Sequence, residues 1–307
     1  MRYTLRQLQV FEAIGRHGTV SAAADRLSMS QSAASTSLAE LERQFECRLF
    51  DRHGKRLRLN ATGMLVLPKI RDLLDRAAEV EGLLSGSLGF GPLRVGATLT
   101  IGNYLGALLV GEYQRRHSGG RVTLEVENTT RIASRVASFD LDLGLIEGEW
   151  DDPDLEVADW VADELAVFAA PGHPLAGDQE TPLERGLEEW WIVREPGSGT
   201  RQTLDRALGP RRGELKVRME LEHTEGIKRA VEAGLGLGCV SRLALKDAFA
   251  RGTLAEIRLR DVDLRRRFRF LLHRQKYHTP GMDAFLGLCR EVAAGAARSD
   301  DMVIPPA

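Results

Sequence analysis

Residues 19–45 contain two helical patterns separated by a tight turn, and this segment constrains the fold more than any other part of the chain. Thr19 is placed to cap a first helix, and Ser30 is placed to cap a second helix after a break at Ser28. In the second helix, apolar residues recur at steps of four, three and four. They predict one buried stripe, formed by Ala34, Leu38, Leu41 and Phe45.

The opposite side of that second helix presents small polar residues, namely Gln31, Ser32, Ser35 and Thr36. Such a face suits entry into a DNA major groove, although a merely solvated helix would carry the same residues. The flanking segments favour DNA. Residues 5–14 carry a third apolar stripe that completes a trihelical core, and residues 48–52 and 56–59 predict a two-stranded wing with a basic turn.

Charge is distributed unevenly along the chain. Residues 1–60 hold ten Lys and Arg against six Asp and Glu, a net charge of +4. The whole chain of 307 residues carries −2, so the remaining 247 residues carry −6. A basic head on an acidic body agrees with nucleic-acid binding by the head.

A set of residues at fixed spacing runs through the head: Leu5, Leu8, Phe11, Gly18, Ala22, Ala23, Ala24, Leu27, Ser30, Gln31, Ser32, Leu41, Glu42, Leu49, Phe50, Arg52 and the run Leu59 to Gly63. In these positions residues 1–60 resemble the winged helix-turn-helix of LysR-type transcriptional regulators. One departure concerns Thr36, where many members of that family carry Arg, the commonest reader of guanine. The target is therefore expected to be read more through the wing and the phosphates.

The resulting DNA-binding hypothesis assigns two roles. The helix residues Gln31, Ser32, Ser35 and Thr36, with Ser21 in the same set, are expected to face the DNA. The basic residues around the wing are expected to meet phosphates or the minor groove, and they are Arg52, Lys55, Arg56 and Arg58.

A long helix is predicted over residues 62–85, with Thr62 as its cap and Pro68 in its second turn. Its apolar residues repeat at heptad spacing and predict a seam that joins two chains, formed by Val66, Ile70, Leu73, Ala77, Val80 and Leu84. Alternatively, these apolar residues of the helix pack on the core of their own domain. The family resemblance implies that this helix pairs two heads, and that further contacts between the bodies usually give a homotetramer. The Gly/Ser-rich residues 85–91 predict a hinge.

From residue 93 onward strand and helix patterns alternate, which predicts largely parallel sheets covered on both faces. The resemblance extends over this region and implies a two-lobed α/β domain like that of periplasmic binding proteins. The fold class is therefore α+β multidomain. Its expected parts are a head (1–60), a linker helix with hinge (61–91), an effector-binding domain (92–298) and a frayed tail (299–307). Lobe I would comprise residues 92–164 and 267–298, and lobe II residues 165–266.

Two loops in the body place hydroxyl groups and glycines between a strand and a helix, at residues 98–103 and 194–201. The unpaired N–H groups at helix starts favour anions there. The family resemblance implies inducer contacts at Thr98, Thr100, Asn103, Thr129, Ser198 and Thr200. The amino-acid sequences of the two loops also resemble those of regulators of sulfur assimilation and carbon fixation. Glu147 would repel an anion unless it points away, or it would accept from the ammonium or hydroxyl of a zwitterion.

Other functions have less support. The three cysteines are far apart, no His, Cys and carboxylate cluster has metal-ligand spacing, and no catalytic triad motif is present. No apolar run reaches membrane-spanning length, and no signal peptide is expected. The basic run 265–267 is interpreted as a solvated stretch on the edge of a strand.

The sequence thus predicts a cytoplasmic transcriptional regulator without enzyme activity, cofactor or metal, whose effector is a small anion. Its expected partners are double-stranded promoter DNA, a second copy of the chain (as dimer or tetramer), a small-molecule inducer and, as a further candidate, RNA polymerase; no membrane is expected. The alternative is a small-molecule binding protein or enzyme with an N-terminal interaction module.

Overall fold

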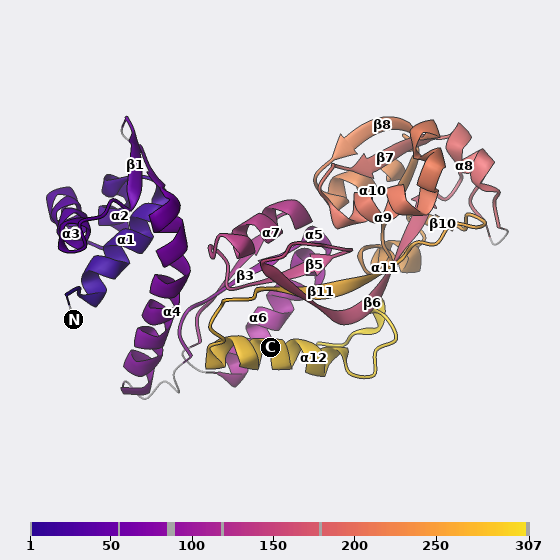
Figure 1. Cartoon of the computed structure of the whole chain (residues 1–307). Coiled ribbons are helices and arrows are strands. Elements are labelled where there is room, and N and C mark those ends of the chain that lie inside the picture. Colours follow the sequence, from indigo (N-terminus) through magenta and orange to yellow (C-terminus); the bar gives the residue numbers. More distant parts are fainter. Residues whose placement is uncertain (1, 55, 85–89, 118–119, 178–179, 305–307) are drawn as a thin grey trace. The chain divides into compact units, whose positions relative to one another are not determined.

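The structure, a computed structural model, describes residues 2–54, 56–84, 90–117, 120–177 and 180–304 (Figure 1). Lys55 and residues 85–89 of the expected hinge thus lie outside the described residues. The chain divides into two compact units, the first holding Met1–Gly91 with Gln275–Pro280 and the second holding Pro92–Arg274 with Gly281–Ala307. In the first unit, the backbone N–H of Tyr277 donates to Asp72 and its hydroxyl donates to Glu79, both at 3.1 Å.

Three helices build the head of the first unit: α1 (Leu5–His17), α2 (Val20–Arg26) and α3 (Gln31–Gln44). Each begins at a hydroxyl cap whose oxygen accepts a backbone N–H, and the caps are Thr4, Thr19 and Ser30. α1 ends at Gly18, whose φ of 71° lies in the left-handed region that glycine adopts without strain. The predicted helix-turn-helix is therefore present, and its caps are the predicted ones.

The apolar faces of these helices form one core, which a two-stranded wing closes. The core includes Leu8, Phe11, Ile14, Ala23, Ala24, Ala34, Leu38 and Leu41. β1 (Phe50–His53) and β2 (Arg56–Leu59) pair antiparallel, and the N–H of Leu57 donates to the carbonyl of Gly18. Phe45 is 47% exposed, so the predicted stripe ends at Leu41, because α3 itself ends one residue before Phe45.

The linker helix α4 spans Ala61–Leu84 and contains Pro68 in its interior. Its cap is Asn60 and not Thr62 as expected. The side-chain oxygen of Asn60 accepts from the backbone N–H of Gly63 at 2.9 Å, which leaves Thr62 inside the first turn.

The predicted heptad seam divides into two parts in this helix. Val66 and Ile70 pack against the core of their own head, together with Leu74 beside the seam. Leu73, Val80 and Leu84 are 36%, 55% and 86% exposed. Packing within the chain therefore accounts for the first part of the seam, and pairing of two chains along the rest stays a prediction.

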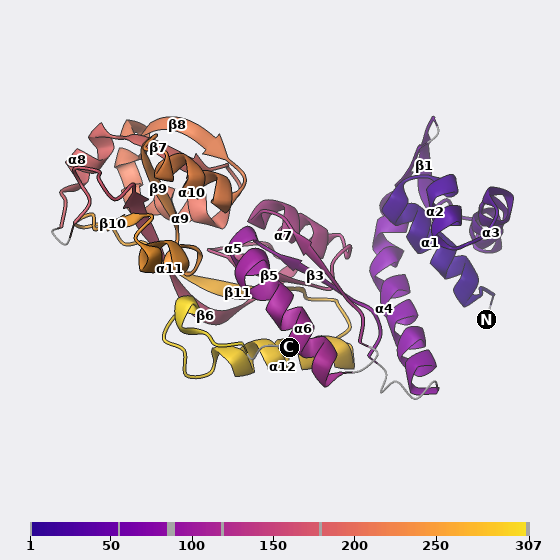
Figure 2. The same cartoon turned by 180° about the vertical axis from the view of Figure 1, so that it is seen from behind.

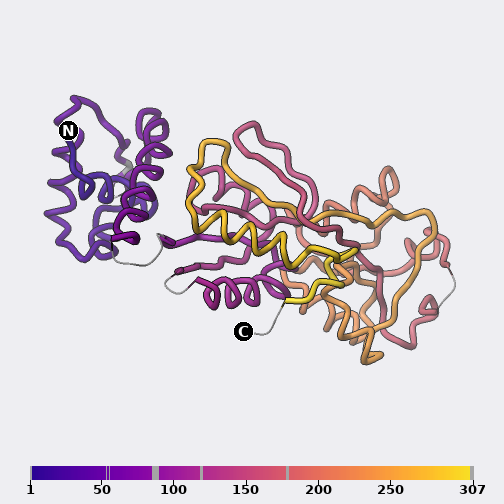
Figure 3. Tube along the Cα trace, turned by 90° about the horizontal axis from the view of Figure 1, so that it is seen from below, coloured from indigo at the N-terminus to yellow at the C-terminus, as the bar shows by residue number. Residues whose placement is uncertain are grey.

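The second unit is built on strands in the order β4-β3-β5-β11-β6-β9-β7-β8, with β10 beside β6. The strands are β3 (Leu93–Ala97), β4 (Val122–Val126), β5 (Leu143–Glu147), β6 (Leu155–Ala169), β7 (Trp190–Arg194), β8 (Lys216–Leu221), β9 (Leu237–Ser241), β10 (Ala255–Ile257) and β11 (Arg265–His273). The part around β3–β5 is lobe I and the part around β7–β10 is lobe II. β6 and β11 run antiparallel, side by side, from one lobe to the other (Figures 1 and 3).

Helices cover both faces of each lobe. In lobe I, α7 (Thr129–Ala137) packs on one face, and α6 (Ala107–Arg116) with α12 (Pro280–Ala293) packs on the other (Figures 1 and 2). In lobe II, α8 (Leu183–Glu188) and α9 (Gly199–Leu208) cover one face, and α10 (Thr224–Glu232) and α11 (Arg242–Arg251) the other. The short elements are α5 (Leu99–Ile101), the π-helix η1 (Gly102–Gly106) and the 3-10 helices η2 (Gly209–Glu214) and η3 (Ser299–Asp301).

Two expectations for this unit are wrong. The sheet is not largely parallel, because β6 and β11 are antiparallel to each other and to β9 and β5, their outer neighbours. Residues 299–304 do not form a frayed tail either. Ser299 is fully buried and donates to Asp163 at 2.5 Å, while Met302 and Ile304 pack on the core of lobe I. A buried carboxylate holds this polar segment, and the segment's own sequence does not reveal that partner.

Candidate functional site

The polar face of α3 is exposed in the first unit. Because α3 buries Ala34 and Leu38 against the head, its polar residues face away from the core. The exposed residues of the DNA-binding hypothesis on the two central helices are Ser21, Gln31, Ser32, Ser35 and Thr36.

The wing adds exposed positive charge to the head. Arg52, Arg56 and Arg58 are exposed, and none of the three forms an ion pair with another described residue. Their guanidinium groups are therefore available to phosphates. Lys55, the fourth basic residue of the hypothesis, lies outside the described part of the chain.

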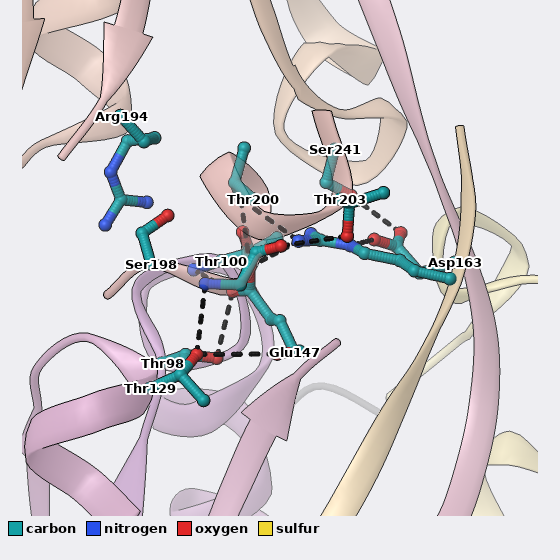
Figure 4. A network of polar contacts seen from close by, with 12 residues as sticks. Thr98, Thr100, Thr129, Glu147, Asp163, Arg194, Ser198, Thr200, Thr203 and Ser241 are labelled. Carbon is teal, nitrogen blue, oxygen red and sulfur yellow. Dashed lines mark hydrogen bonds and ion pairs between the residues drawn. The ribbon is translucent and has the colours of Figure 1, made fainter. Parts of the chain in front are cut away.

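Five of the six residues expected to bind an effector lie together in the second unit (Figure 4). Thr98 and Thr100 follow β3, Thr129 begins α7, and Ser198 and Thr200 begin α9; each is at most 3% exposed. Asn103, the sixth, is exposed on η1 and has no hydrogen bond to the other five. The structure therefore separates Asn103 from the group, because the helical turn after Thr100 directs it to solvent.

The carboxylate of Glu147, at the end of β5, fills the centre of this group (Figure 4). Its Oε1 accepts from Thr98 Oγ1 and from the backbone N–H of Thr100, both at 2.9 Å. Its Oε2 accepts from Thr200 Oγ1 at 3.1 Å and lies 2.8 Å from Arg266 Nη1. Glu147 is 1% exposed, so groups from both lobes and from β11 hold a buried anion at this point.

Arg266 connects Glu147 to a second buried carboxylate. Its Nε donates to Asp163 Oδ2 at 2.6 Å, and the other Asp163 oxygen accepts from Ser241 Oγ at 2.7 Å. The interpretation of residues 265–267 as a solvated stretch is wrong for Arg266, which is 5% exposed. The reason is that β11 is a central strand with alternating burial, so its neighbours at 265 and 267 point outward.

Opposing effects act on the pKa of Glu147. Burial, the largest single effect, raises this pKa. The guanidinium groups of Arg266 and Arg194 and the hydrogen bonds from Thr100 and Thr98 together lower it and prevail, so the pKa lies below its ordinary value. Arg194 is itself buried and pairs with Glu195 at 2.8 Å. Glu147 is therefore ionised at neutral pH.

Direct contacts between the lobes surround the Glu147 group. Thr129 Oγ1 of lobe I accepts from the backbone N–H of Gly199 in lobe II at 3.2 Å. A Cβ on residue 199 would lie 2.1 Å from the carbonyl oxygen of Glu147, so this close approach requires glycine. A cavity of about 830 Å³ adjoins these contacts, and its lining includes Thr129, Ser198, Arg201 and Arg206.

Sequence reasoning found the hydroxyl groups of the site but missed most of its charged residues, namely Asp163, Arg194 and Arg266. One signal was present for the last of these. Arg266 lies two and four residues before Phe268 and Phe270 on β11, and both phenylalanines are fully buried. Because successive side chains of a strand point to opposite faces, these three side chains share one face of the sheet. Asp163 carried no comparable signal, because its burial depends on pairing between β6 and β11.

Within the described ranges, no three His, Cys, Asp or Glu side chains are arranged to hold a metal ion. No described helix is both long and apolar enough to cross a membrane. The three cysteines are free, and burial raises the pKa of the Cys239 thiol to about 12, which disfavours a reactive thiolate.

The winged head, the long helix and the two-lobed body with a polar cleft define a class of protein: a DNA-binding module joined to a ligand-binding module. Residues 5–64 match the family described as bacterial regulatory helix-turn-helix protein, lysR family, and residues 87–294 match the LysR substrate binding domain. The chain therefore belongs to the LysR family of transcriptional regulators, and the family predicted from the sequence is confirmed.

The chain is similar to regulators along most of its length. It is 38% identical over 289 residues to the uncharacterized HTH-type transcriptional regulator YeiE of Escherichia coli K12, covering 94% of this chain and 98% of that protein. It is 33% identical to the RuBisCO operon transcriptional regulator of Allochromatium vinosum, covering 93% and 95% of the two chains. The solved regulatory domain of Synechocystis PCC6803 CcmR in complex with 2-PG matches with a TM-score of 0.61 and 28% identity, over 67% of this chain and 98% of that one.

We expect Glu147→Gln to weaken the acid dependence of thermal stability. Because the pKa of Glu147 is lowered by folding, its charge stabilises the folded state above the ordinary value of 4.5. This stabilisation is lost as the pH falls through the folded-state pKa. Melting temperatures at neutral and acid pH should therefore differ less in Glu147→Gln than in the wild type.

The matched control is Glu149→Gln, since the Glu149 side chain is 62% exposed and lies two residues away. This control should keep the wild-type pH dependence. An unchanged pH dependence in Glu147→Gln would contradict the assigned charge.

Proposed function

We propose that this LysR-family regulator senses a small anionic metabolite in the cleft around Glu147 and alters promoter binding in response. One observation carries the proposal: the buried Glu147 carboxylate is held by two threonine hydroxyls, a backbone N–H and a guanidinium, the donor set of an anion site. DNase footprinting of the promoter beside the protein's own gene tests the regulatory role. Protection over several helical turns supports it, and no protection at low salt contradicts it.

Each part of the chain has its own proposed function. Residues 1–60 bind DNA, residues 61–91 join the chains, and residues 92–298 bind the effector, with lobe I formed by 92–164 and 267–298 and lobe II by 165–266. A regulator of this kind acts in the cytoplasm on promoter DNA and has RNA polymerase as a candidate partner.

On DNA, we assign different roles to the α3 face and to the wing. Gln31, Ser32, Ser35 and Thr36, with Ser21, face base edges, which the exposure of these short polar side chains supports. Arg52, Arg56 and Arg58, with Lys55, meet phosphates or the minor groove. The exposed guanidinium groups on the wing, which form no ion pair with another described residue, support this second role.

We expect Arg56→Ala to weaken binding to all DNA sequences and to reduce the slope of log affinity against log salt by about one. Gln31→Ala should instead relax the preference at particular base pairs by about 1–3 kcal/mol. Fluorescence anisotropy on the footprinted site and on random DNA distinguishes the two. Arg43→Ala is the control, because Arg43 is exposed but already paired with Glu40 at 2.6 Å. Equal losses on both DNAs for both variants would contradict the assignment.

For assembly, we propose that α4 pairs with α4 of a second copy. An apolar groove of about 380 Å³ between α1, α3 and α4 supports this, and Phe45, Ile70 and Leu73 are among its lining residues. Farther along the same helix, Leu83 and Leu84 are 57% and 86% exposed and could fill the partner's groove.

A second contact would take dimers to tetramers. β4 and β8 end the strand path of the second unit, and each is paired on one side by a described strand. Val126 on β4, and Val217 and Met219 on β8, are more than a third exposed. Such open apolar edges favour contact between bodies.

We expect Leu73→Asp combined with Val80→Asp to give smaller particles that bind DNA without cooperativity. These two seam residues are exposed in the single chain, so the charges disrupt pairing without entering the head core. Light scattering measures particle size, and Met64→Ser, an exposed change on α4 outside the seam, is the control. An unchanged oligomer in the double variant would count against the seam.

For the effector, we propose contacts with Thr98, Thr100, Thr129, Ser198 and Thr200, and with Asn103 if the helix after Thr100 shifts. The relatives support a small metabolite: one is named for the RuBisCO operon, and CcmR was solved with 2-PG. A thermal-shift screen of small anions and metabolites would identify the ligand, because a ligand of the native state raises its stability.

We expect Thr100→Val and Thr200→Val each to remove the response to the ligand and to leave DNA binding intact. Each change removes a hydroxyl at nearly constant volume, and the loss of one donor in a buried site lowers affinity roughly tenfold. Calorimetry with the ligand found in the screen measures this, with Thr123→Val, an exposed change on β4 outside the cavity lining, as control. Unaltered affinity in both buried variants would locate the ligand elsewhere.

A further inference from the structure

Glu147 makes the contacts that a bound ligand would make in a two-lobed cleft. Its two oxygens receive donors from Thr98 and Thr100 after β3, from Thr200 on α9 and from Arg266 on β11. Glu147 therefore bridges lobe I, lobe II and a crossover strand, as a ligand held between the lobes does.

The carboxylate does not satisfy every donor that surrounds it. Thr100 Oγ1 and Arg266 Nη2 are buried and have no hydrogen-bond partner among the described residues. Both residues already contact Glu147 through another atom, Thr100 through its N–H and Arg266 through Nη1. Each unpaired donor thus lies next to a donor that Glu147 uses, and leaving such donors unpaired is unfavourable.

Each of the two carboxylate oxygens of Glu147 already accepts from two donors. An oxyanion with three or four oxygens in a pyramidal or tetrahedral arrangement would supply acceptors for the two remaining donors. Planar carboxylates would not, because they repeat what Glu147 already provides.

A second anion cannot simply join Glu147. Arg266 is already shared between Glu147 and Asp163, which are buried at 1% and 2% exposure. Adding a further negative charge beside two buried carboxylates would be strongly unfavourable. An incoming anion must therefore displace the Glu147 side chain from its donors.

We propose that Glu147 is a built-in substitute ligand, and that the effector is an oxyanion of three or more oxygens, such as a sulfur or phosphorus oxyanion, that replaces it. This inference rests on the proposed effector cleft. Without effector, the Glu147 carboxylate bridges the two lobes; with effector bound, the oxyanion bridges them instead. The signal is the release of the Glu147 side chain from its donors.

The experiment uses the full-length protein with sulfate, sulfite and phosphate as probes and acetate as the planar comparison, by titration calorimetry. Glu147→Gln keeps the size of the side chain but removes the competing charge, so at least one oxyanion should bind roughly tenfold more tightly than in the wild type. Glu156→Gln, an exposed change on β6 outside the lining of the adjoining cavity, is the control and should not change the affinity. Unchanged oxyanion binding in Glu147→Gln would overturn the proposal. Weaker binding would also overturn it, and would indicate that Glu147 accepts a hydrogen bond from the ligand.

A second variant tests the substitution directly. Glu147→Ala vacates the carboxylate position, and acetate should then raise the melting temperature of this variant but not that of the wild type. If neither acetate nor an oxyanion stabilises Glu147→Ala, Glu147 is not a substitute ligand.

Thr100→Val tests the shape of the ligand. It removes the unpaired hydroxyl but keeps the N–H that holds Glu147, so the wild-type melting temperature should be kept while oxyanion affinity falls. Acetate binding the wild type as tightly as the oxyanions would overturn the shape argument. These failures are distinguishable from failure of the proposed function, because a clear footprint with no oxyanion binding refutes only the substitute ligand.

Discussion

The buried guanidinium of Arg266 is the interaction on which the ligand-binding unit depends. It pairs with Glu147 at 2.8 Å and with Asp163 at 2.6 Å, and all three side chains are almost fully excluded from water. Burying charges is costly, and removing one partner leaves an uncompensated charge, which is strongly destabilising. The three residues lie on β5, β6 and β11, which are neighbours in the sheet, so one charged cluster fixes the centre of the unit.

The position of this cluster gives it influence over both lobes. β6 and β11 carry the chain from one lobe to the other, and Arg266 is the register partner of Asp163 across them. Thr200 Oγ1 of lobe II donates to Glu147 and accepts from Arg266 at 3.0 Å. Any change in the charge or position of Glu147 therefore acts on the crossover strands and on the start of α9 together, which is what a sensor between two lobes requires.

Local patterns were sufficient for the head and insufficient for the cleft. Caps and helical periodicity depend on residues a few positions apart, so Thr19, Ser30 and the stripe through Leu41 could be identified from the sequence. The threonines of the cleft could be found because they follow strands. Asp163 and Arg266 are 103 residues apart and meet only through strand pairing, which no local pattern encodes. Asn103 lies apart from these threonines for a related reason, since the turn of η1 decides where its side chain points.

The linker helix shows how one apolar pattern can serve two environments. A stripe needed only for the head core could end near Leu74, the last α4 residue that packs on that core. The pattern instead continues to Val80 and Leu84, which are more than half exposed in the described chain. Exposed apolar residues at helical spacing are unfavourable in water unless another surface covers them. The continuation therefore favours a second helix as the cover, and a two-fold pairing of α4 would present two heads to DNA at a fixed spacing.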